Sequence, residues 1–169
     1  YKVEIEASAT VNAGTEWSKS DFKPTLPNGH TFEGTLTMGA SDVGTYRSDN
    51  AEQEGKFSWT VAPRVFKGEA DMTDNFEFAT VVEVKVDAIG FEIGQIDGYS
   101  AEYTGEAQPL GKGIEVANSE ELEGFKIVYG LSEDDMSENI PTATNVGEYT
   151  VYFKISAKNH SDYSGSYSA

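Results

Sequence analysis

Apolar and polar residues alternate in several stretches of this chain, which is the pattern of β-strands with one buried face. In residues 1–7, Val3 and Ile5 occupy one face of such a strand and charged residues occupy the other. Residues 31–38 repeat the alternation. Residues 76–86 are long and rich in β-branched side chains, which predicts a strand in the middle of a sheet.

Further alternation predicts strands in the rest of the chain. Residues 56–61 place Phe57, Trp59 and Val61 on one side of a strand, so we expect Trp59 in a core. Shorter strands are predicted at residues 100–103, 114–116, 125–129, 149–156 and 164–169. Together these stretches predict an all-β fold.

One short segment carries the signals of a helix. Asn118 followed by Glu121 resembles a capping box, which predicts a helical turn over residues 119–123 that Gly124 ends. A helix of two or more turns packed across a sheet would indicate a β-grasp fold, and a single turn would indicate an Ig-like sandwich. The strand pattern alone leaves both architectures open.

A seven-residue pattern occurs twice, as Ala, a hydroxyl residue, Asx, Val, Gly, any residue and Tyr. The copies are residues 40–46 and 143–149. We expect a turn that leads into a strand, with Gly44 equivalent to Gly147 and with Gly147 at φ > 0. The chain is therefore predicted to contain two versions of one unit, the first with more residues between this turn and its closing strand.

The junction between the units is apolar. Ile89, Phe91 and Ile93 occupy alternate positions where a flexible linker would be polar, so we expect them to be partly buried. We place the boundary at about residue 93. The prediction is two small tandem domains, residues 1–93 and 94–169, each a β-sandwich or β-grip of Ig-like or grasp-like type.

Charge and composition narrow the possible functions. Acidic residues outnumber basic ones by 29 to 12, and the formal net charge is −17. This balance argues against binding to nucleic acid or to anionic membranes, because both require Lys and Arg clusters. The absence of Cys excludes disulfides, thiol catalysis and Cys-ligated zinc. With no membrane-length apolar run, initiator Met or signal peptide, we expect a piece of a longer extracellular or surface protein.

Four motifs of residues 99–169 together carry a family resemblance. They are Tyr103-Thr104-Gly105, Val128-Tyr129-Gly130, Asn145-Val146-Gly147-Glu148-Tyr149 and Asn159-His160-Ser161-Asp162-Tyr163. The set resembles the tandem "mostly beta grip" (MBG, Tyr-Asp-Gly-type) and Ig-like repeats of Gram-positive cell-surface proteins. The first unit is similar to a companion repeat through residues 40–46 and 73–81, but residues 11–14 replace the Tyr-x-Gly opening. The resemblance implies a non-catalytic stalk or adhesin module and transfers no active-site residues.

The sequence offers no catalytic constellation. His30 and His160 are far apart in the sequence and lie beside turn residues, so we expect them in exposed loops. No motif for a P-loop, a nucleophile elbow or a zinc protease is present. We therefore expect neither an enzyme nor a cofactor.

Two groups of loop carboxylates are of the type that calcium uses. They are Asp71 with Asp74, and Glu133, Asp134 and Asp135. Neither group has the spacing of an EF-hand, so solvated acidic loops are the favoured interpretation.

Four aromatic residues are candidates for a platform that binds a sugar or a protein: Trp17, Tyr46, Tyr152 and Tyr163. Trp17 lies in a predicted loop and is the best of them. Lys154 alternates away from the apolar face of its strand, which argues against an isopeptide crosslink.

Three functions fit these observations. The leading hypothesis is a structural spacer or adhesin stalk whose partners are neighbouring domains of the same chain. The second is a module that binds glycan or a host surface protein. The third is an accessory domain of a secreted hydrolase.

Overall fold

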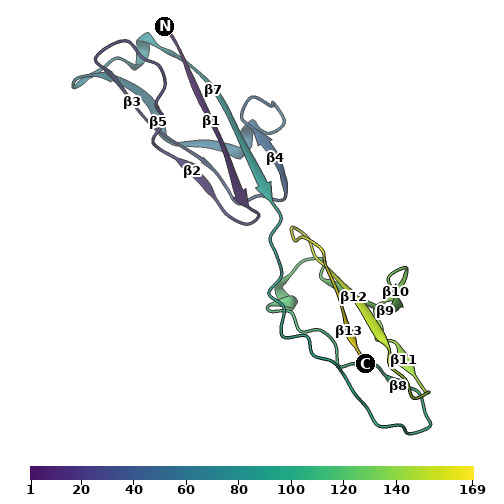
Figure 1. Cartoon of the computed structure of the whole chain (residues 1–169). Helices are drawn as coiled ribbons and strands as arrows, with labels where there is room; N and C mark the ends of the chain where they lie inside the picture. Colours follow the sequence, from purple (N-terminus) through teal and green to yellow (C-terminus); the bar gives the residue numbers. More distant parts are fainter. The chain divides into compact units, whose positions relative to one another are not determined.

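Thirteen β-strands and three single-turn 3-10 helices make up the secondary structure, so the predicted all-β fold is confirmed. The structure, a computed structural model, describes all 169 residues. It divides into two units, Tyr1–Ala88 (unit 1) and Ile89–Ala169 (unit 2) (Figure 1). No helix has the length and apolar character needed to cross a membrane.

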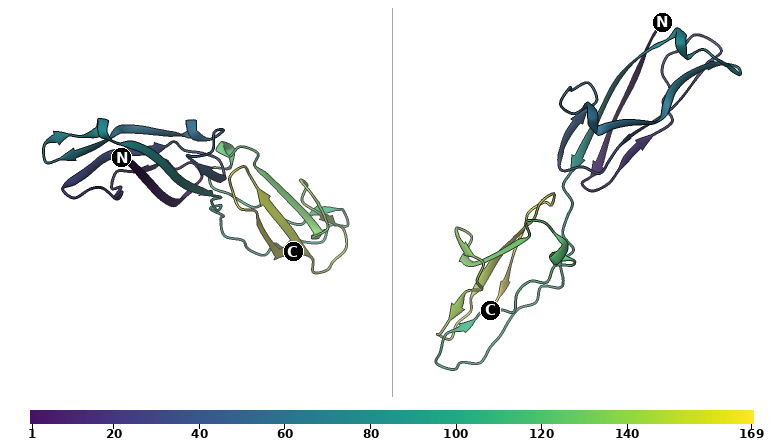
Figure 2. Two further views of the ribbon diagram at one scale, coloured as in Figure 1. Left: turned by 90° about the horizontal axis from the view of Figure 1, so that it is seen from above. Right: turned by 180° about the vertical axis from the view of Figure 1, so that it is seen from behind.

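Unit 1 has two sheets. Its strands are β1 (Lys2–Asn12), β2 (Trp17–Lys19), β3 (His30–Met38), β4 (Gly44–Arg47), β5 (Phe57–Lys67), β6 (Ala70–Asp71) and β7 (Glu77–Asp87), with 3-10 turns at Glu54–Lys56 (η1) and Thr73–Asn75 (η2). One sheet has the order β1-β7-β4 and the other β2-β3-β5-β6. Strands β1 and β7 run parallel and side by side over their full length (Figures 1 and 2).

The core of unit 1 follows from the alternation of its strands. Val3 and Ile5 of β1 are buried, as predicted. Residues of β7 and β3 complete the buried set, namely Val82, Val84, Val86, Leu36 and Met38. Because both sheets contribute to one cluster, unit 1 is a β-sandwich.

Strand β5 departs from simple alternation. Trp59 packs against the core as predicted, but Val61 is 40% exposed, so its predicted place on the same face is wrong. The pairing with β3 explains the difference, since Leu36 lies opposite Trp59 while Thr35 lies opposite Val61. One extra residue in β5 is a bulge that turns the following side chain to the other face.

Unit 2 has one larger sheet and one short strand pair. Its strands are β8 (Gln108–Pro109), β9 (Lys126–Ser132), β10 (Asp135–Ser137), β11 (Thr142–Ala143), β12 (Thr150–Ser156) and β13 (Tyr163–Ser168). The sheet has the order β10-β9-β12-β13, and β11 pairs with β8. Val151, Phe153 and Ile155 of β12 are fully buried. The strands predicted at residues 100–103 and 114–116 do not form, apart from a single bridge between Ile93 and Val116.

The junction residues belong to unit 2. The Ile89 N–H donates to the Asn159 carbonyl at 3.0 Å, and Phe91 and Ile93 pack on the core of unit 2. All three are half-buried, as predicted. Because these contacts are made with unit 2, the boundary lies before Ile89 and not near residue 93.

The predicted helix is a single turn. Residues Ser119–Glu121 (η3) form one 3-10 turn, and Gly124 at φ +68° follows it. The predicted capping box is wrong, because Asn118 adopts the left-handed conformation and makes no side-chain cap bond. Without a helix packed across a sheet, the architecture is of the sandwich type and not a β-grasp.

The repeated seven-residue pattern forms the same structure in both units. The hydroxyl of Tyr46 donates to the Asp42 carbonyl at 2.8 Å, and that of Tyr149 donates to the Asn145 carbonyl at 2.9 Å. This is the geometry of a tyrosine corner, in which a Tyr hydroxyl bonds to backbone a few residues upstream. The strand at each corner pairs antiparallel with the closing strand of its unit, as β4 with β7 and β12 with β13. In unit 1, β5 and β6 are inserted between those two strands, which accounts for its greater length.

The predicted backbone conformation of the repeated glycine is wrong. Neither Gly44 nor Gly147 adopts a positive φ. A Cβ built on either glycine would lie 3.7 Å from the ring of the Tyr two residues later, which is ordinary contact. The two glycines are therefore equivalent, as predicted. The Tyr ring and its hydrogen bond hold the corner, and a left-handed glycine does not.

Two glycine substitutions distinguish the effect of close packing on stability from the effect of turn conformation. A Cβ on Gly165 would lie 2.7 Å from Cζ of the buried Phe153 ring, whereas a Cβ on Gly147 meets no such obstacle. We expect Gly165→Ala to destabilise unit 2 by about 1–3 kcal/mol, at roughly 4–8 °C of melting temperature per kcal/mol. Gly147→Ala should be neutral or stabilise by about 0.4–1 kcal/mol. Calorimetry of both variants tests this, and equal melting temperatures would contradict it.

Removing the hydroxyl group of either corner tyrosine should lower the stability of the unit that contains it. Tyr46→Phe and Tyr149→Phe each remove one hydrogen bond, which costs about 0.5–1.5 kcal/mol. Tryptophan fluorescence reports the melting of unit 1, because Trp17 and Trp59 both lie there. Tyr46→Phe should lower that transition and Tyr149→Phe should leave it unchanged, with calorimetry showing the reverse for unit 2. A variant that lowered neither transition would argue against the corner as a stabilising element.

Candidate functional site

The best aromatic candidate from the sequence is a core residue. Trp17 belongs to β2, is only 7% exposed and meets the Phe57 ring edge-on at 6.3 Å between centroids. The prediction that it lies in a loop is wrong. The sequence signal was obscured because β2 is only three residues long and shows no alternation of its own.

The other aromatic candidates do not share a surface. The Tyr46 hydroxyl forms the tyrosine-corner hydrogen bond to the Asp42 carbonyl. Tyr163 pairs across from Ile155 and stacks on the Phe153 ring at 6.0 Å, so it lies on the inner face of its sheet. Tyr152 occupies the opposite face, because successive strand residues alternate. The structure therefore does not assemble an aromatic platform from these residues.

The two groups of loop carboxylates do not form a metal site, and one of their members has a local structural role. An Asp71 carboxylate oxygen accepts hydrogen bonds from the Thr73 hydroxyl and, at 2.9 Å, from the Thr73 N–H, which holds the pKa of Asp71 below its ordinary value. Asp74 lies exposed in η2. Glu133 and Asp134 form the turn between β9 and β10, and Asp135 begins β10. No three His, Asp or Glu side chains are gathered in a way that could hold a metal ion.

Both histidines pack against aromatic rings. The His160 ring stacks on Phe91 at 4.7 Å between centroids, and His30 meets Phe76 edge-on at 5.7 Å. Both are half-buried, so the prediction of exposed loop histidines is wrong. Lys154 is exposed, as predicted, and its ammonium group lies 3.3 Å from the Asp162 carboxylate.

The strand of unit 1 that bears most on function is β1. In the ladder, Lys2 pairs with Glu77 and Asn12 with Asp87, and the Glu77 N–H donates to the Tyr1 carbonyl at 2.8 Å. In a parallel pair, alternate residues direct both backbone groups at the neighbouring strand. The odd-numbered residues of β1 therefore bond to β7. The even-numbered residues direct their N–H and C=O groups outward, because β1 is the last strand of its sheet.

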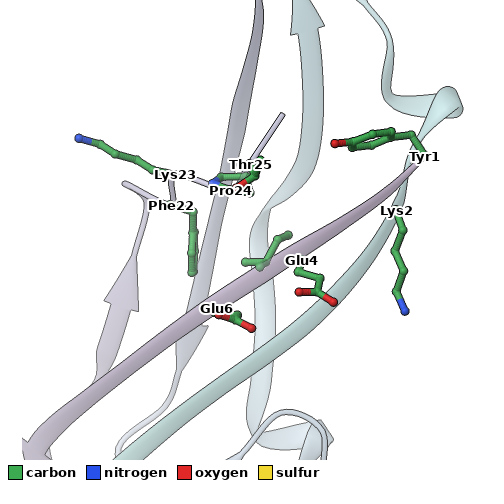
Figure 3. A pocket seen from close by; sticks show the side chains of 9 residues that line it. Tyr1, Lys2, Glu4, Glu6, Phe22, Lys23, Pro24 and Thr25 are labelled. Carbon is green, nitrogen blue, oxygen red and sulfur yellow. The ribbon is translucent and has the colours of Figure 1, made fainter. Parts of the chain in front are cut away.

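A cavity of about 420 Å³ lies along this outer edge of β1. Ile5 and Phe22 supply apolar lining, and Pro24 lies beside them. Figure 3 shows Phe22 and Pro24 on one side of β1 and the carboxylates of Glu4 and Glu6 on the other. The sequence predicted the alternation of β1 but not its position at a sheet edge, since that depends on which strands pair.

A second cavity of about 550 Å³, in unit 2, is bordered by Tyr167 of β13. The Tyr167 hydroxyl donates to the Leu110 carbonyl at 2.7 Å. Burial, with smaller effects of Tyr129 and Tyr99, raises the pKa of Tyr167 above its ordinary value of 10.0. The ionised form is therefore disfavoured in the folded unit.

This pKa shift predicts a loss of stability in alkali. A raised folded pKa means that the contribution of Tyr167 is fully present below pH 10 and is lost as pH rises through the folded value. Tyr167→Phe should lower the stability of unit 2 at about pH 8 by roughly 1 kcal/mol, through the lost hydrogen bond. As the pH rises from about 8 to about 11, the stability of the Tyr167→Phe variant should fall by less than that of the parent chain. Urea unfolding of both chains across this range tests it, and equal further losses in the two chains would contradict it.

No family model, no curated protein and no solved structure matches this chain. The functional argument is therefore made from the geometry of the two units themselves.

Proposed function

We propose that the chain is a non-catalytic, load-bearing spacer in a bacterial cell-surface or secreted protein, where it connects neighbouring domains of the same chain. The resemblance of residues 99–169 to MBG repeats supports the surface location. The tandem all-β units fit a role that requires extension and no ligand site. The observation that carries the proposal is the parallel ladder between β1 and β7.

The ladder places the two ends of unit 1 at opposite ends of one pair of strands. Strand β1 begins at Lys2 and β7 ends at Asp87, and both strands run in the same direction for 11 residues. A force that pulls these ends apart acts along the strands. Every interstrand hydrogen bond then resists together, whereas a hairpin pulled open at its ends loses its bonds one at a time.

The corresponding contact in unit 2 is much smaller. The first segment of unit 2 also runs parallel to the closing strand, but it is bonded only at two places. The Ile89 backbone bonds with Asn159 and Ser161, and the Tyr99 N–H donates to the Ser168 carbonyl at 2.9 Å. Unit 2 therefore has fewer bonds to resist the same direction of force.

The alternatives lack comparable support. A glycan platform needs exposed aromatic rings on one surface, and Trp17, Tyr46, Tyr152 and Tyr163 are not arranged in this way. An accessory domain of a hydrolase requires no structural feature that would distinguish it from a spacer. The spacer remains the function that the ladder favours.

Single-molecule stretching from the two ends of the full chain tests the proposal. We expect two unfolding events, with unit 2 yielding at the lower force and unit 1 at the higher force. A disulfide can assign them, because the chain has no Cys and Glu6 lies opposite Val81 on the exposed face of the ladder. Neighbouring strands are close enough for this bond.

The locked variant Glu6→Cys/Val81→Cys should lose the high-force event and regain it after reduction. Loss of the low-force event instead would show that unit 1 is the weaker unit. That result would overturn the assignment of β1 and β7 as the load-bearing contact.

A further inference from the structure

One asparagine of this chain precedes a glycine, and the pair lies in the turn that leads into β3. Asn28 and Gly29 are both exposed, and the side-chain amide of Asn28 makes no hydrogen bond. The His30 N–H donates to the Pro27 carbonyl at 3.1 Å, and Gly29 has a φ of +79°. Only the glycine of this turn has a positive φ, as in a type II turn. The Asn28 side chain is therefore free to turn toward the backbone of Gly29.

The space around Gly29 is open. A Cβ built on Gly29 would meet no atom within 4 Å, and glycine itself carries no side chain. A bond between the Gly29 nitrogen and Cγ of Asn28 would close a five-membered ring, and nothing obstructs this approach. Every other asparagine is followed by a residue whose side chain crowds the corresponding nitrogen. These asparagines are Asn12, Asn50, Asn75, Asn118, Asn139, Asn145 and Asn159.

The His30 ring is held against the carbonyl of the same peptide group. Its Nδ1 lies 3.1 Å from the Asn28 carbonyl oxygen and 3.2 Å from the Pro27 carbonyl oxygen. Because carbonyl oxygens only accept, Nδ1 carries the hydrogen and donates it. This hydrogen bond draws electron density from the Asn28–Gly29 amide, which makes the Gly29 N–H more acidic. An edge-on contact with Phe76, at 5.7 Å between centroids, keeps the ring in place.

We propose that Asn28 is a site of self-modification, at which the chain converts asparagine into isoaspartate and aspartate with the help of the His30 hydrogen bond. The Gly29 nitrogen loses its proton to water and forms a bond to Cγ of Asn28. The bond from Cγ to the side-chain nitrogen breaks, and this nitrogen takes a proton from water and leaves as ammonia.

The product of this first step is a succinimide, which water then opens. Attack on the backbone carbonyl carbon breaks its bond to the Gly29 nitrogen, so the chain continues through Cγ as isoaspartate. Attack on Cγ breaks the new bond and gives aspartate. Water is the only co-reactant, and neither an oxidant nor a reductant takes part.

The modified chain differs from the original in charge and in backbone length. Isoaspartate places one more methylene in the backbone directly before β3, which begins at His30. It also replaces a neutral amide by a carboxylate beside the His30 ring. The segment that ends at this turn packs Phe22 and Leu26 on the core of unit 1. The reaction therefore changes the connection between a core segment and a core strand.

The test incubates the full folded chain at neutral pH and follows each asparagine by proteolysis and mass spectrometry. We expect Asn28 to gain the mass of deamidation at least about tenfold faster than any other asparagine, which corresponds to a barrier lower by about 1.4 kcal/mol. Isoaspartate should form in the same peptide. Asp97 also precedes a glycine, but its isomerisation leaves the mass unchanged and so is distinguished. Conversion at Asn28 no faster than at the other asparagines would overturn the proposal.

A second experiment tests the part played by the fold. His30→Phe removes the Nδ1–H donor and keeps an aromatic ring beside Phe76. It should slow the reaction of the folded chain about threefold or more, on the scale of one net hydrogen bond. In a blocked synthetic peptide of residues 25–32, where nothing holds the ring in place, the same substitution should leave the rate unchanged. A folded variant that reacts as fast as the parent, or an equal slowing in the peptide, would overturn the role of His30.

Matched variants test the place of the reaction through the ammonia that it releases. Asn28→Gln lengthens the side chain by one methylene, so the smaller ring can no longer form, and the early release of ammonia should disappear. The control Asn50→Gln makes the same change at another exposed turn asparagine of unit 1 and should leave the release unchanged. Equal release from the two variants would overturn the proposal. Tryptophan fluorescence confirms that each variant is folded.

Discussion

The backbone pairing of the closing strand is the interaction on which each unit depends. Strand β7 bonds antiparallel to β4 on one side and parallel to β1 on the other. Strand β13 bonds antiparallel to β12, and the first segment of unit 2 runs parallel along its other side. The tyrosine corner lies at the start of the antiparallel partner in both units, since Tyr46 lies within β4 and Tyr149 directly precedes β12. In each unit, the first segment and the strand at the tyrosine corner therefore both lie beside the same closing strand.

A difference in length explains why only unit 1 completes its ladder. In unit 2 the first segment meets the closing region at Ile89, beside His160, and at Tyr99, beside Ser168. The Ile89 N–H donates to the Asn159 carbonyl and the Tyr99 N–H to the Ser168 carbonyl, so ten residues of advance on one side face nine on the other. Parallel strands rise equally, by about 3.3 Å per residue, so the longer segment cannot run straight between these contacts. It bows away and pairs Ile93 with Val116 instead.

The sequence predicted local features well and pairing poorly. Alternation located β1, β7 and β12, and the repeated pattern located two equivalent turns, because these depend on neighbouring residues; the tyrosine hydrogen bonds of those turns were not predicted. It misplaced Val61 because a bulge is defined only against the partner strand. It misjudged Trp17 because burial there comes from rings distant in the sequence. For Gly147, the positive φ was inferred from residue type, whereas the Tyr149 ring governs the turn.

The backbone groups of β1 are divided between the ladder with β7 and the outer edge of the sheet. Its odd-numbered residues bond to β7 and resist a pull on the ends of unit 1, while its even-numbered residues face outward. A change at the outer edge would therefore leave the β1–β7 bonds in place. It would also lie outside the path of force, because that path runs from β1 directly into β7. The mechanical resistance that we propose for unit 1 therefore depends on the β1–β7 ladder and not on the outer edge of β1.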